Sequence, residues 1–320
     1  MAQAKGSKGQ LLGAVKEATY NTTPGTPSMV NLPFNSCNLR PSQNMITPAT
    51  ITSARSQVAP ALGNIDLAGQ VVVPVDVLAM GYWLQMLLGD PTADTDNGDG
   101  TYSHVFKVPD SIDSWIMELG FTDIGEYWLY NGCKANQMTL QLGGDNELTA
   151  TIDVIGGKAT RGASSQDASP TSVALTRFNN FQLVVKEGGS ASTQLIGCSL
   201  AINNNLDTSV YLIGGSGYRG SLPEGMVNVS GSLTAIYEDN TLFAKALAGT
   251  ESSLQFTFTN GDNVLDILLD ECLYSMTGPA IETPAGVQIS LNFQAYYANG
   301  ANSSACVITL TNTQAAYIAA

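Results

Sequence analysis

The chain has 320 residues, enough for two domains that each bury a core. Hydrophobic residues make up 44% of it and charged residues only 12%, against roughly 25% charged residues in an average soluble domain. This composition argues against disorder and favours a surface that meets other protein. No apolar run approaches the roughly 18 residues that cross a bilayer, and the N-terminus lacks the apolar core of a secretory signal, so we expect cytoplasmic folding.

The charge is strongly acidic and unevenly distributed. Residues 1–27 hold three lysines against one glutamate, so the remainder must carry −16 for the total to be −14. No lysine or arginine follows Lys245. Because nucleic-acid binding depends on Lys and Arg that displace counterions, such a body should repel free nucleic acid. The charge therefore argues against a sequence-reading DNA-binding protein.

Five cysteines are scattered through the chain without a Cys-x-x-Cys pair. An odd number at wide spacing favours buried reduced thiols over a disulfide framework or a zinc site. These residues are Cys37, Cys133, Cys198, Cys272 and Cys306.

Segments rich in β-branched and aromatic residues predict a protein that is mainly strands. The expected strands are 71–75, 137–142, 148–154, 181–186, 227–237, 254–258, 287–297 and 306–310. In 148–154 the apolar residues fall at every second position, which is the period of a sheet with one buried face. The turn Gly143–Asn146 separates two such runs and predicts a hairpin.

Two segments predict helices. Residues 76–88 open with Asp76 and end at Gly89, and residues 239–248 open with Asp239 and end at Gly249. Aspartate is a capping residue, and glycine is the usual residue after a helix. The pattern predicts one short helix in each half of the chain.

Both halves share landmarks that indicate an internal duplication. Cys37 precedes Gly69 by 32 residues, and Cys198 precedes Gly231 by 33. Cys133 and Cys272 each lie 15 residues before an alternating strand. One polar insertion in the first half reconciles the remaining spacing. We therefore expect an arm at 1–27, a first domain at 28–160 with a long loop at 90–110, a linker at 161–174, a second domain at 175–311 and a tail at 312–320.

The sequence shows no catalytic, cofactor or metal pattern. His104 is the one histidine, and beside aromatic neighbours it favours packing or surface over catalysis. Asp94–Gly100 resembles a calcium loop, but Val105 stands where the bidentate Glu belongs, so a glycine-rich turn before a strand is favoured. The cluster Gly214–Gly220 lacks the Lys-Ser/Thr and helix of a phosphate loop, and we expect it to lie on a neighbour.

The chain resembles the tail tube, or major tail, proteins of long-tailed non-contractile bacteriophages. The order of several segments carries the resemblance, and none is diagnostic alone. They are Gln10–Tyr20, Gly25–Pro27, Arg55–Ser56, Ala68–Gly69, Leu88–Asp90 and Asp99–Phe106. Asn21 stands where the family usually has glycine, so the arm differs in detail.

This resemblance implies a mainly β fold of two tandem β-sandwich or half-barrel domains, each with one short flanking α-helix. It implies a non-enzymatic virion protein of the tail, assembled in the host cytoplasm without membrane insertion or cofactors. Its partners would be other copies in rings, three chains with pseudo-sixfold symmetry or six chains, stacked into a tube. The tape measure protein and DNA would pass through the lumen, and tail tip and terminator proteins would bind the ends.

Two sets of residues follow as candidates. Contacts between subunits or rings are expected at Lys8, Leu12, Lys16, Tyr20, Asp96, Asp99, Tyr102, His104, Tyr218 and Arg219. Acids expected to face the lumen, where they would repel phosphate, are Asp145, Glu147 and Asp153. Because a register error of one residue reverses each face, the inward direction stays open at this stage.

Two alternative functions remain open on sequence alone. One is another virion or surface subunit, such as a capsid decoration, distal-tail or S-layer protein. The other is a carbohydrate-binding or enzymatic β-domain from a tail fibre. Fold alone does not separate these classes.

Overall fold

The structure is a computed structural model that describes residues 3–281, 286–297 and 302–317. Strands dominate, so the predicted mainly β class is confirmed. The first part of the chain contains β1 (Gly9–Lys16), β2 (Val30–Asn31), β3 (Ser36–Cys37), β4 (Arg40–Ile46), β5 (Ala61–Pro74), α1 (Ala79–Leu88), β6 (Ala93–Asp96), β7 (Tyr102–Lys107), β8 (Trp115–Phe121), β9 (Glu126–Leu142), β10 (Thr149–Gly156), β11 (Lys158–Gly162) and β12 (Thr171–Ser172). The rest contains β13 (Leu183–Glu187), β14 (Ser190–Ala191), β15 (Leu195–Asn203), β16 (Asn228–Ile236), α2 (Thr241–Ala248), β17 (Ser252–Asn260), β18 (Asn263–Tyr274), β19 (Gln288–Ala295) and β20 (Val307–Asn312).

The strands before and after residue 175 pair in the same order. In the first half, antiparallel pairing runs β4–β5–β10–β9–β8–β1. In the second half it runs β15–β16–β19–β18–β17–β13, also antiparallel throughout. Each half also has its helix after the second strand of this order. The two halves therefore share one topology.

Local details of the two halves also coincide. An added Cβ at Gly69 would lie 2.4 Å from the Leu39 Cα, and one at Gly231 would lie 2.0 Å from the Ser199 carbonyl oxygen. Glycine is required at both places because a neighbouring backbone approaches so closely. The pairings β8–β9 and β17–β18 are each irregular next to a cysteine, Cys133 or Cys272. These matched irregularities lie where the sequence landmarks predicted a correspondence.

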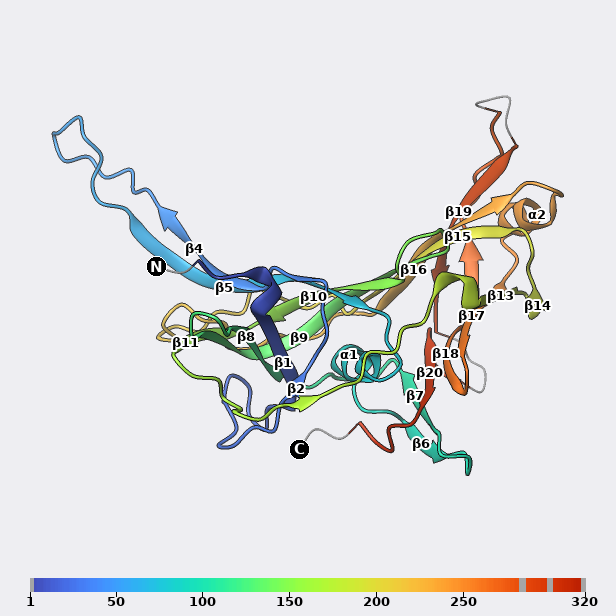
Figure 1. Cartoon of the computed structure of the whole chain (residues 1–320). Helices are drawn as coiled ribbons and strands as arrows, with labels where there is room; N and C mark the ends of the chain where they lie inside the picture. The colour runs from blue at the N-terminus through green and yellow to red at the C-terminus, as the bar shows by residue number, and fades with distance from the viewer. Residues whose placement is uncertain (1–2, 282–285, 298–301, 318–320) are drawn as a thin grey trace.

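Two strand pairings join the halves within the chain. The C-terminal part of β9 pairs with β15 from Leu142↔Cys198 to Gln137↔Asn203. Elsewhere in the fold, β7 of the first half pairs with β20 of the second along six positions. A short parallel pair, β12 with β2, fixes the segment between the halves to the first half. Figure 1 shows the resulting body, in which α1 lies below the strands of β9 and β10 and near β7 and β20.

One large hydrophobic core is common to both halves. It includes Ile152 of β10, Leu200 of β15 and Phe256 of β17, all essentially inaccessible to solvent. Burial alternates along β10 and β19, so one face of each strand packs into the core. The alternation that the sequence showed for these strands is confirmed.

The helices begin later than predicted, at Ala79 and Thr241. The reason at α1 is local: Asp76 Oδ1 accepts hydrogen bonds from the amides of Leu78 and Ala79. This Asx-type turn precedes the helix and supplies acceptors for its first amides. The predicted hairpin turn at Gly143–Asn146 does connect the antiparallel strands β9 and β10.

Three segments differ from the expected organisation. Residues 9–16 of the predicted arm form β1 beside β8, since Leu11 and Leu12 are buried there. The long loop predicted at 90–110 contains the hairpin β6–β7. The predicted linker at 161–174 is held by Glu118, which accepts hydrogen bonds from Ser165 and Gln166. Residues 1–2 and 318–320 of the predicted arm and tail lie outside the described residues.

Candidate self-assembly surfaces

The N-terminal candidates contact their own chain. Leu12 of β1 is fully buried, whereas Lys8 is exposed. Lys16 Nζ lies 2.5 Å from Asp90 Oδ1 and 2.9 Å from Asp113 Oδ2. Burial lowers the pKa of Lys16, but the hydrogen bonds to both carboxylates outweigh it and the pKa stands above its usual value. This lysine therefore ties β1 to the segment after α1.

Four candidates lie on the hairpin β6–β7. Asp96 and Asp99 are exposed and accept hydrogen bonds within the turn, from the amides of Gly98 and Thr101. The Thr101 bonds lower the pKa of Asp99. Tyr102 is half-buried and opposes Asn312 of β20. The glycine-rich turn that sequence favoured over a calcium loop is present.

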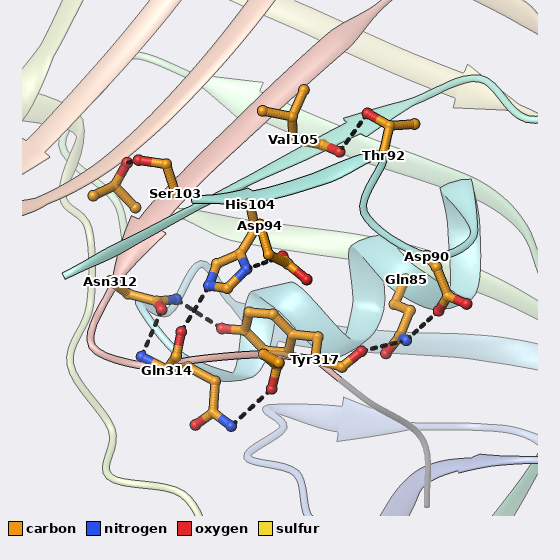
Figure 2. Close-up of polar contacts among 12 residues, drawn as sticks. Gln85, Asp90, Thr92, Asp94, Ser103, His104, Val105, Asn312, Gln314 and Tyr317 are labelled. Atoms are coloured by element: carbon orange, nitrogen blue, oxygen red, sulfur yellow. Dashed lines mark hydrogen bonds and ion pairs between the residues drawn. The ribbon is translucent and has the colours of Figure 1, made fainter. Parts of the chain in front are cut away.

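His104, on the same hairpin, is completely buried (Figure 2). Its Nδ1 lies 2.5 Å from Asp94 Oδ1 and its Nε2 lies 2.8 Å from the Gln314 carbonyl oxygen. Its ring also packs edge-on against Tyr317, with centroids 4.8 Å apart. Within the single chain the imidazole is a packing residue that links the hairpin to the C-terminal segment.

The C-terminal segment 312–317 in turn covers α1 (Figure 2). Tyr317 is 2% exposed, and its ring lies against Gly81, where a Cβ would come within 2.1 Å of it. Its hydroxyl donates to the Leu78 carbonyl oxygen at 2.7 Å, and Gln85 Nε2 donates to the Tyr317 carbonyl oxygen at 2.6 Å. The helix of the first half is therefore sealed by a segment of the second.

The glycine-rich loop also docks within the chain. Arg219 is 4% exposed and forms an ion pair with Asp66. Its Nη1 donates to the carbonyl oxygens of Leu67 and Gly156 at 3.2 and 3.1 Å. Tyr218 and Tyr20 line one hollow beside this arginine. The loop expected on a neighbouring chain lies here on the first half of its own chain.

One face of the sheet β10–β9–β15–β16–β19 carries short polar side chains and turns away from the core. We call it the polar face. By strand pairing it includes Gln137, Thr139, Gln141, Thr149, Thr151, Asp153, Ser199, Ala201, Asn203, Ser230, Ser232, Thr234, Ser290, Asn292 and Gln294, and at one end Ile155 and Lys134. Of the three predicted lumen acids, only Asp153 belongs to it. Asp145 lies in the β9–β10 turn, and Glu147 forms an ion pair with Arg177 at 3.1 Å.

A hollow of about 420 Å³ opens between β4 and the outer strands of the first half. Leu119, Phe121 and Trp128 line it and are partly exposed. By strand pairing, the equivalent residues of the second half are Phe256, Phe258 and Ile267, which are fully buried in one core with α1. The same site is thus covered in one half and open in the other.

The two helices show the complementary difference. In α1, nine of the ten residues are buried. In α2, only Leu242 and Ala246 are buried, and Leu247 is 62% exposed. α1 lies at the junction of the halves, where Asn204 Nδ2 donates to its Leu87 carbonyl oxygen at 2.9 Å. α2 lies at the outer end of the second half (Figure 1).

A family model described as phage tail tube protein matches residues 7–295, which includes nearly all strands of both halves. The chain belongs to this family. It is therefore a structural component of a phage tail, as the resemblance of the sequence implied. A search among curated proteins found no match.

Sequence reasoning missed one prominent feature of this tail tube protein. The hairpin β4–β5 projects beyond the rest of the molecule (Figure 1). Its apolar side chains are exposed: Met45 by 72%, Ile51 by 95% and Leu62 by 67%. Isolated apolar residues between prolines and threonines gave a weak signal, because neither strand alternates clearly. Exposed apolar residues on one projecting element indicate a contact surface.

The cysteine side chains of this tail tube protein are largely removed from solvent. Four of its cysteine thiols are buried, Cys37 is half-buried, and burial raises the pKa of Cys198 and Cys306 to about 12. Within the described residues, no three His, Cys, Asp or Glu side chains gather as metal ligands. Neither described α-helix is long and apolar enough to cross a membrane.

Proposed function

We propose that this tail tube protein assembles into closed rings that stack into the tube through which DNA leaves the virion. Assembly would take place in the host cytoplasm, around the tape measure protein, with terminator and tail tip proteins at the ends. We further propose that its two halves are duplicated domains. One observation carries the proposal: the halves share a topology, but the chain makes only one of two equivalent junctions.

The junction made within the chain joins β15 to the C-terminal part of β9. Its counterparts are β4, equivalent to β15, and the end of β18, equivalent to the end of β9. Among the described residues β4 pairs only with β5, and β18 ends at Tyr274 beside β19. Unpaired edges are templates for another chain, and closing them around an axis removes them.

The helices support the same arrangement. α1 and the C-terminal segment cover the core at the junction of the halves. By contrast, most of α2 is exposed, and among the described residues no helix covers the hollow beside β4. A neighbouring copy that repeats the junction would bring its α2 toward this hollow. Both surfaces are apolar, with Leu247 on the helix and Phe121 and Trp128 in the hollow. A second copy of the chain therefore fits both by chemistry and by the internal duplication.

The test is assembly of a variant with a charge on α2. We expect Leu247→Lys to fold, with an unchanged unfolding temperature, because the side chain is exposed in the single chain. It should remain monomeric, since the lysine charge would enter an apolar interface without a partner. The matched control is Ile124→Lys in the β8–β9 turn, 42% exposed and on neither surface, which should assemble.

Tube formation by each variant is measured by negative-stain electron microscopy and sedimentation. Hollow tubes from the wild type and the control, with none from Leu247→Lys, support the proposal. Tubes from Leu247→Lys would overturn the proposed contact. Dispersed wild-type monomers at all concentrations would overturn the function itself.

A further inference from the structure

We propose that Arg55 of one chain binds the second half of a neighbouring chain in the ring, at a copy of the site where Arg219 binds the first half of its own chain. This inference deepens the proposed function and rests on it, because it requires that the junction between chains repeats the junction within the chain. It gives the exposed hairpin β4–β5 a defined partner: a second copy, bound through a named donor and named backbone acceptors.

The site within the chain holds one arginine by several acceptors. Arg219 belongs to the loop between β15 and β16, and its Nη1 donates to the carbonyl oxygens of Leu67 and Gly156. These two residues oppose each other in the pair β5–β10. Asp66, next to Leu67, adds an ion pair. The loop of the second half is thereby fixed to the sheet of the first, beside the strand pairing β9–β15.

The second half repeats this backbone. When the two glycines with close backbone neighbours are aligned, the pair Leu67↔Gly156 corresponds to Val229↔Ala295. Asn228, which is exposed, stands where the first half has its aspartate. A carbonyl oxygen has two lone pairs, so it can accept an arginine N–H in addition to a ladder bond. We call the carbonyl oxygens of Val229 and Ala295, together with Asn228, the receiving site.

Arg55 has in the hairpin β4–β5 the place that Arg219 has in the loop between β15 and β16. It precedes Gly69 by 14 residues, and Arg219 precedes Gly231 by 12. Arg55 is exposed, and none of the described hydrogen bonds or ion pairs involves its guanidinium. The hairpin extends away from the body of its own chain (Figure 1). The acceptors for this arginine therefore belong to another copy.

Apolar contacts would accompany the arginine. Within the chain, the Gly217 carbonyl oxygen accepts from the Ile65 amide at 2.8 Å, so the glycine-rich loop lies along β5. By the same alignment, Ile65 corresponds to Val227 of the second half, next to Met226, which is 88% exposed. On the hairpin, Ile51 is 95% exposed. Large apolar side chains exposed on both surfaces fit a contact between copies.

The charges of the two surfaces are also complementary. Glu271 lies beside the residue that pairs with Ala295 in β18–β19. Partial desolvation and the nearby carboxylates of Glu251 and Asp270 raise the pKa of Glu271. Neither β18 nor β19 contains a lysine or arginine, whereas residues 40–65 carry two arginines and no acid. The hairpin of a neighbouring copy would therefore bring a cation to an acidic surface that lacks one.

The test compares the lowest concentration of the full chain at which tubes sediment. Arg55→Met removes the donor. Asn228→Asp gives the receiving site a carboxylate like that of the Arg219 site, and the double variant Arg55→Met/Asn228→Asp completes a cycle. The matched control is Arg40→Met, an exposed arginine of the same hairpin. It corresponds to Ala201 of β15, so the junction within the chain already has an apolar side chain there.

Arg55→Met should raise this concentration at least about tenfold, because two carbonyl oxygens lose a charged donor. Arg40→Met should change it less than about twofold. Asn228→Asp should lower it about threefold at about 20 mM salt and less at about 200 mM, since the added pair is partly exposed. This gain should vanish in the double variant. Unfolding temperatures of the unassembled variants should match the wild type, which separates assembly from folding.

Tubes of Arg55→Met at the wild-type concentration would overturn the proposal. A loss in Arg55→Met together with an equal gain from Asn228→Asp in both backgrounds would show that the arginine binds elsewhere, and would overturn the receiving site. Failure of the wild type to form tubes at any concentration would instead overturn the ring itself, so the two failures are distinguished.

Discussion

Single buried side chains fasten the halves of the molecule to each other. Arg219 reaches from the β15–β16 loop to two carbonyl oxygens of the first half and to Asp66. Its planar fork meets several acceptors at once, which a lysine ammonium does not. The glycine-rich loop around it thus acquires a fixed place through one residue.

Arg219→Met should destabilise the chain by about 3 kcal/mol, because the buried carbonyl oxygens of Leu67 and Gly156 lose their donor. Denaturant unfolding of the unassembled protein measures the change. The matched control is Arg55→Met, an exposed arginine, with an expected change below about 0.5 kcal/mol. Equal stability of the two variants would contradict the fastening role of Arg219.

Glu224 gives a pH dependence with a defined sign. Burial alone would raise its pKa, but hydrogen bonds, above all from Lys134 at 2.6 Å, lower it below the usual 4.5. A carboxylate with a depressed folded pKa contributes stability above the unfolded pKa and loses it as pH falls through the folded pKa. Glu224→Gln should therefore be less stable than wild type at pH near 7, and this gap should close below about pH 4.

Unfolding free energies of both proteins across this range supply the measurement. Asp110→Asn, at an exposed carboxylate, serves as the control, and its stability at neutral pH should stay within about 0.5 kcal/mol of wild type. A gap for Glu224→Gln that stays constant from neutral to acid pH would show that the ion pair does not contribute.

At the scale of elements, α1 depends on a segment far away in the sequence. The sequence predicted the helix correctly, but not its cover, because residues 312–317 meet it only in three dimensions. Tyr317 shows the two contributions: its ring fills the space above Gly81, and its hydroxyl bonds to Leu78 and Asn312.

Substitution of Tyr317 should separate these contributions. Tyr317→Phe should cost about 1 kcal/mol, because it removes the hydroxyl bonds alone. Tyr317→Ala should cost about 3 to 5 kcal/mol, because it also leaves a cavity over α1. Thermal unfolding reports both, and nearly equal losses would mean that the ring contributes little to the cover.

Much of the strand content could be predicted because period and composition are local. The alternation in β10 and β19 placed their core faces correctly, and Gly69 and Gly231 were recognised as matching landmarks of the two halves. Pairing could not be predicted in the same way. A strand was expected after the glycine-rich turn at 94–100, but its pairing with β20, about 200 residues away, was not. Residues 9–16 were predicted as part of an arm because the burial of β1 depends on its pairing with β8.

The candidate contact residues show the same limit. The types Lys, Tyr and Arg suit an interface, but Lys16, His104 and Arg219 satisfy their polar groups within the chain. A better signal was spread over several strands, because the residues of the polar face form one surface only after five strands align. A sequence shows each strand separately, and the register decides which residues share a face.

At the scale of the whole molecule, the two halves share a topology but are not interchangeable. β20 pairs with β18 as β11 pairs with β9, but β7 adds a further strand beside β20. Among the described residues no strand pairs with the corresponding edge of β11. The hairpin β6–β7 belongs to the first half alone. In a ring, first and second halves must therefore alternate around the axis.

With the six domains per ring that the family resemblance implies, this alternation predicts the symmetry of the ring. If each junction between chains repeats the junction within the chain, six halves require three chains of 33.5 kDa, about 100 kDa in total. Cryo-electron microscopy of the tube should then show threefold symmetry at the level of the outer strands, with a near-sixfold inner wall. Asp153 should appear three times per ring, alternating with Asn292. Because the halves differ at the hairpin, averaging with true sixfold symmetry should blur β6–β7 and leave the inner strands sharp. A ring of six chains, with twelve halves around the axis, would contradict the equivalence of the two junctions.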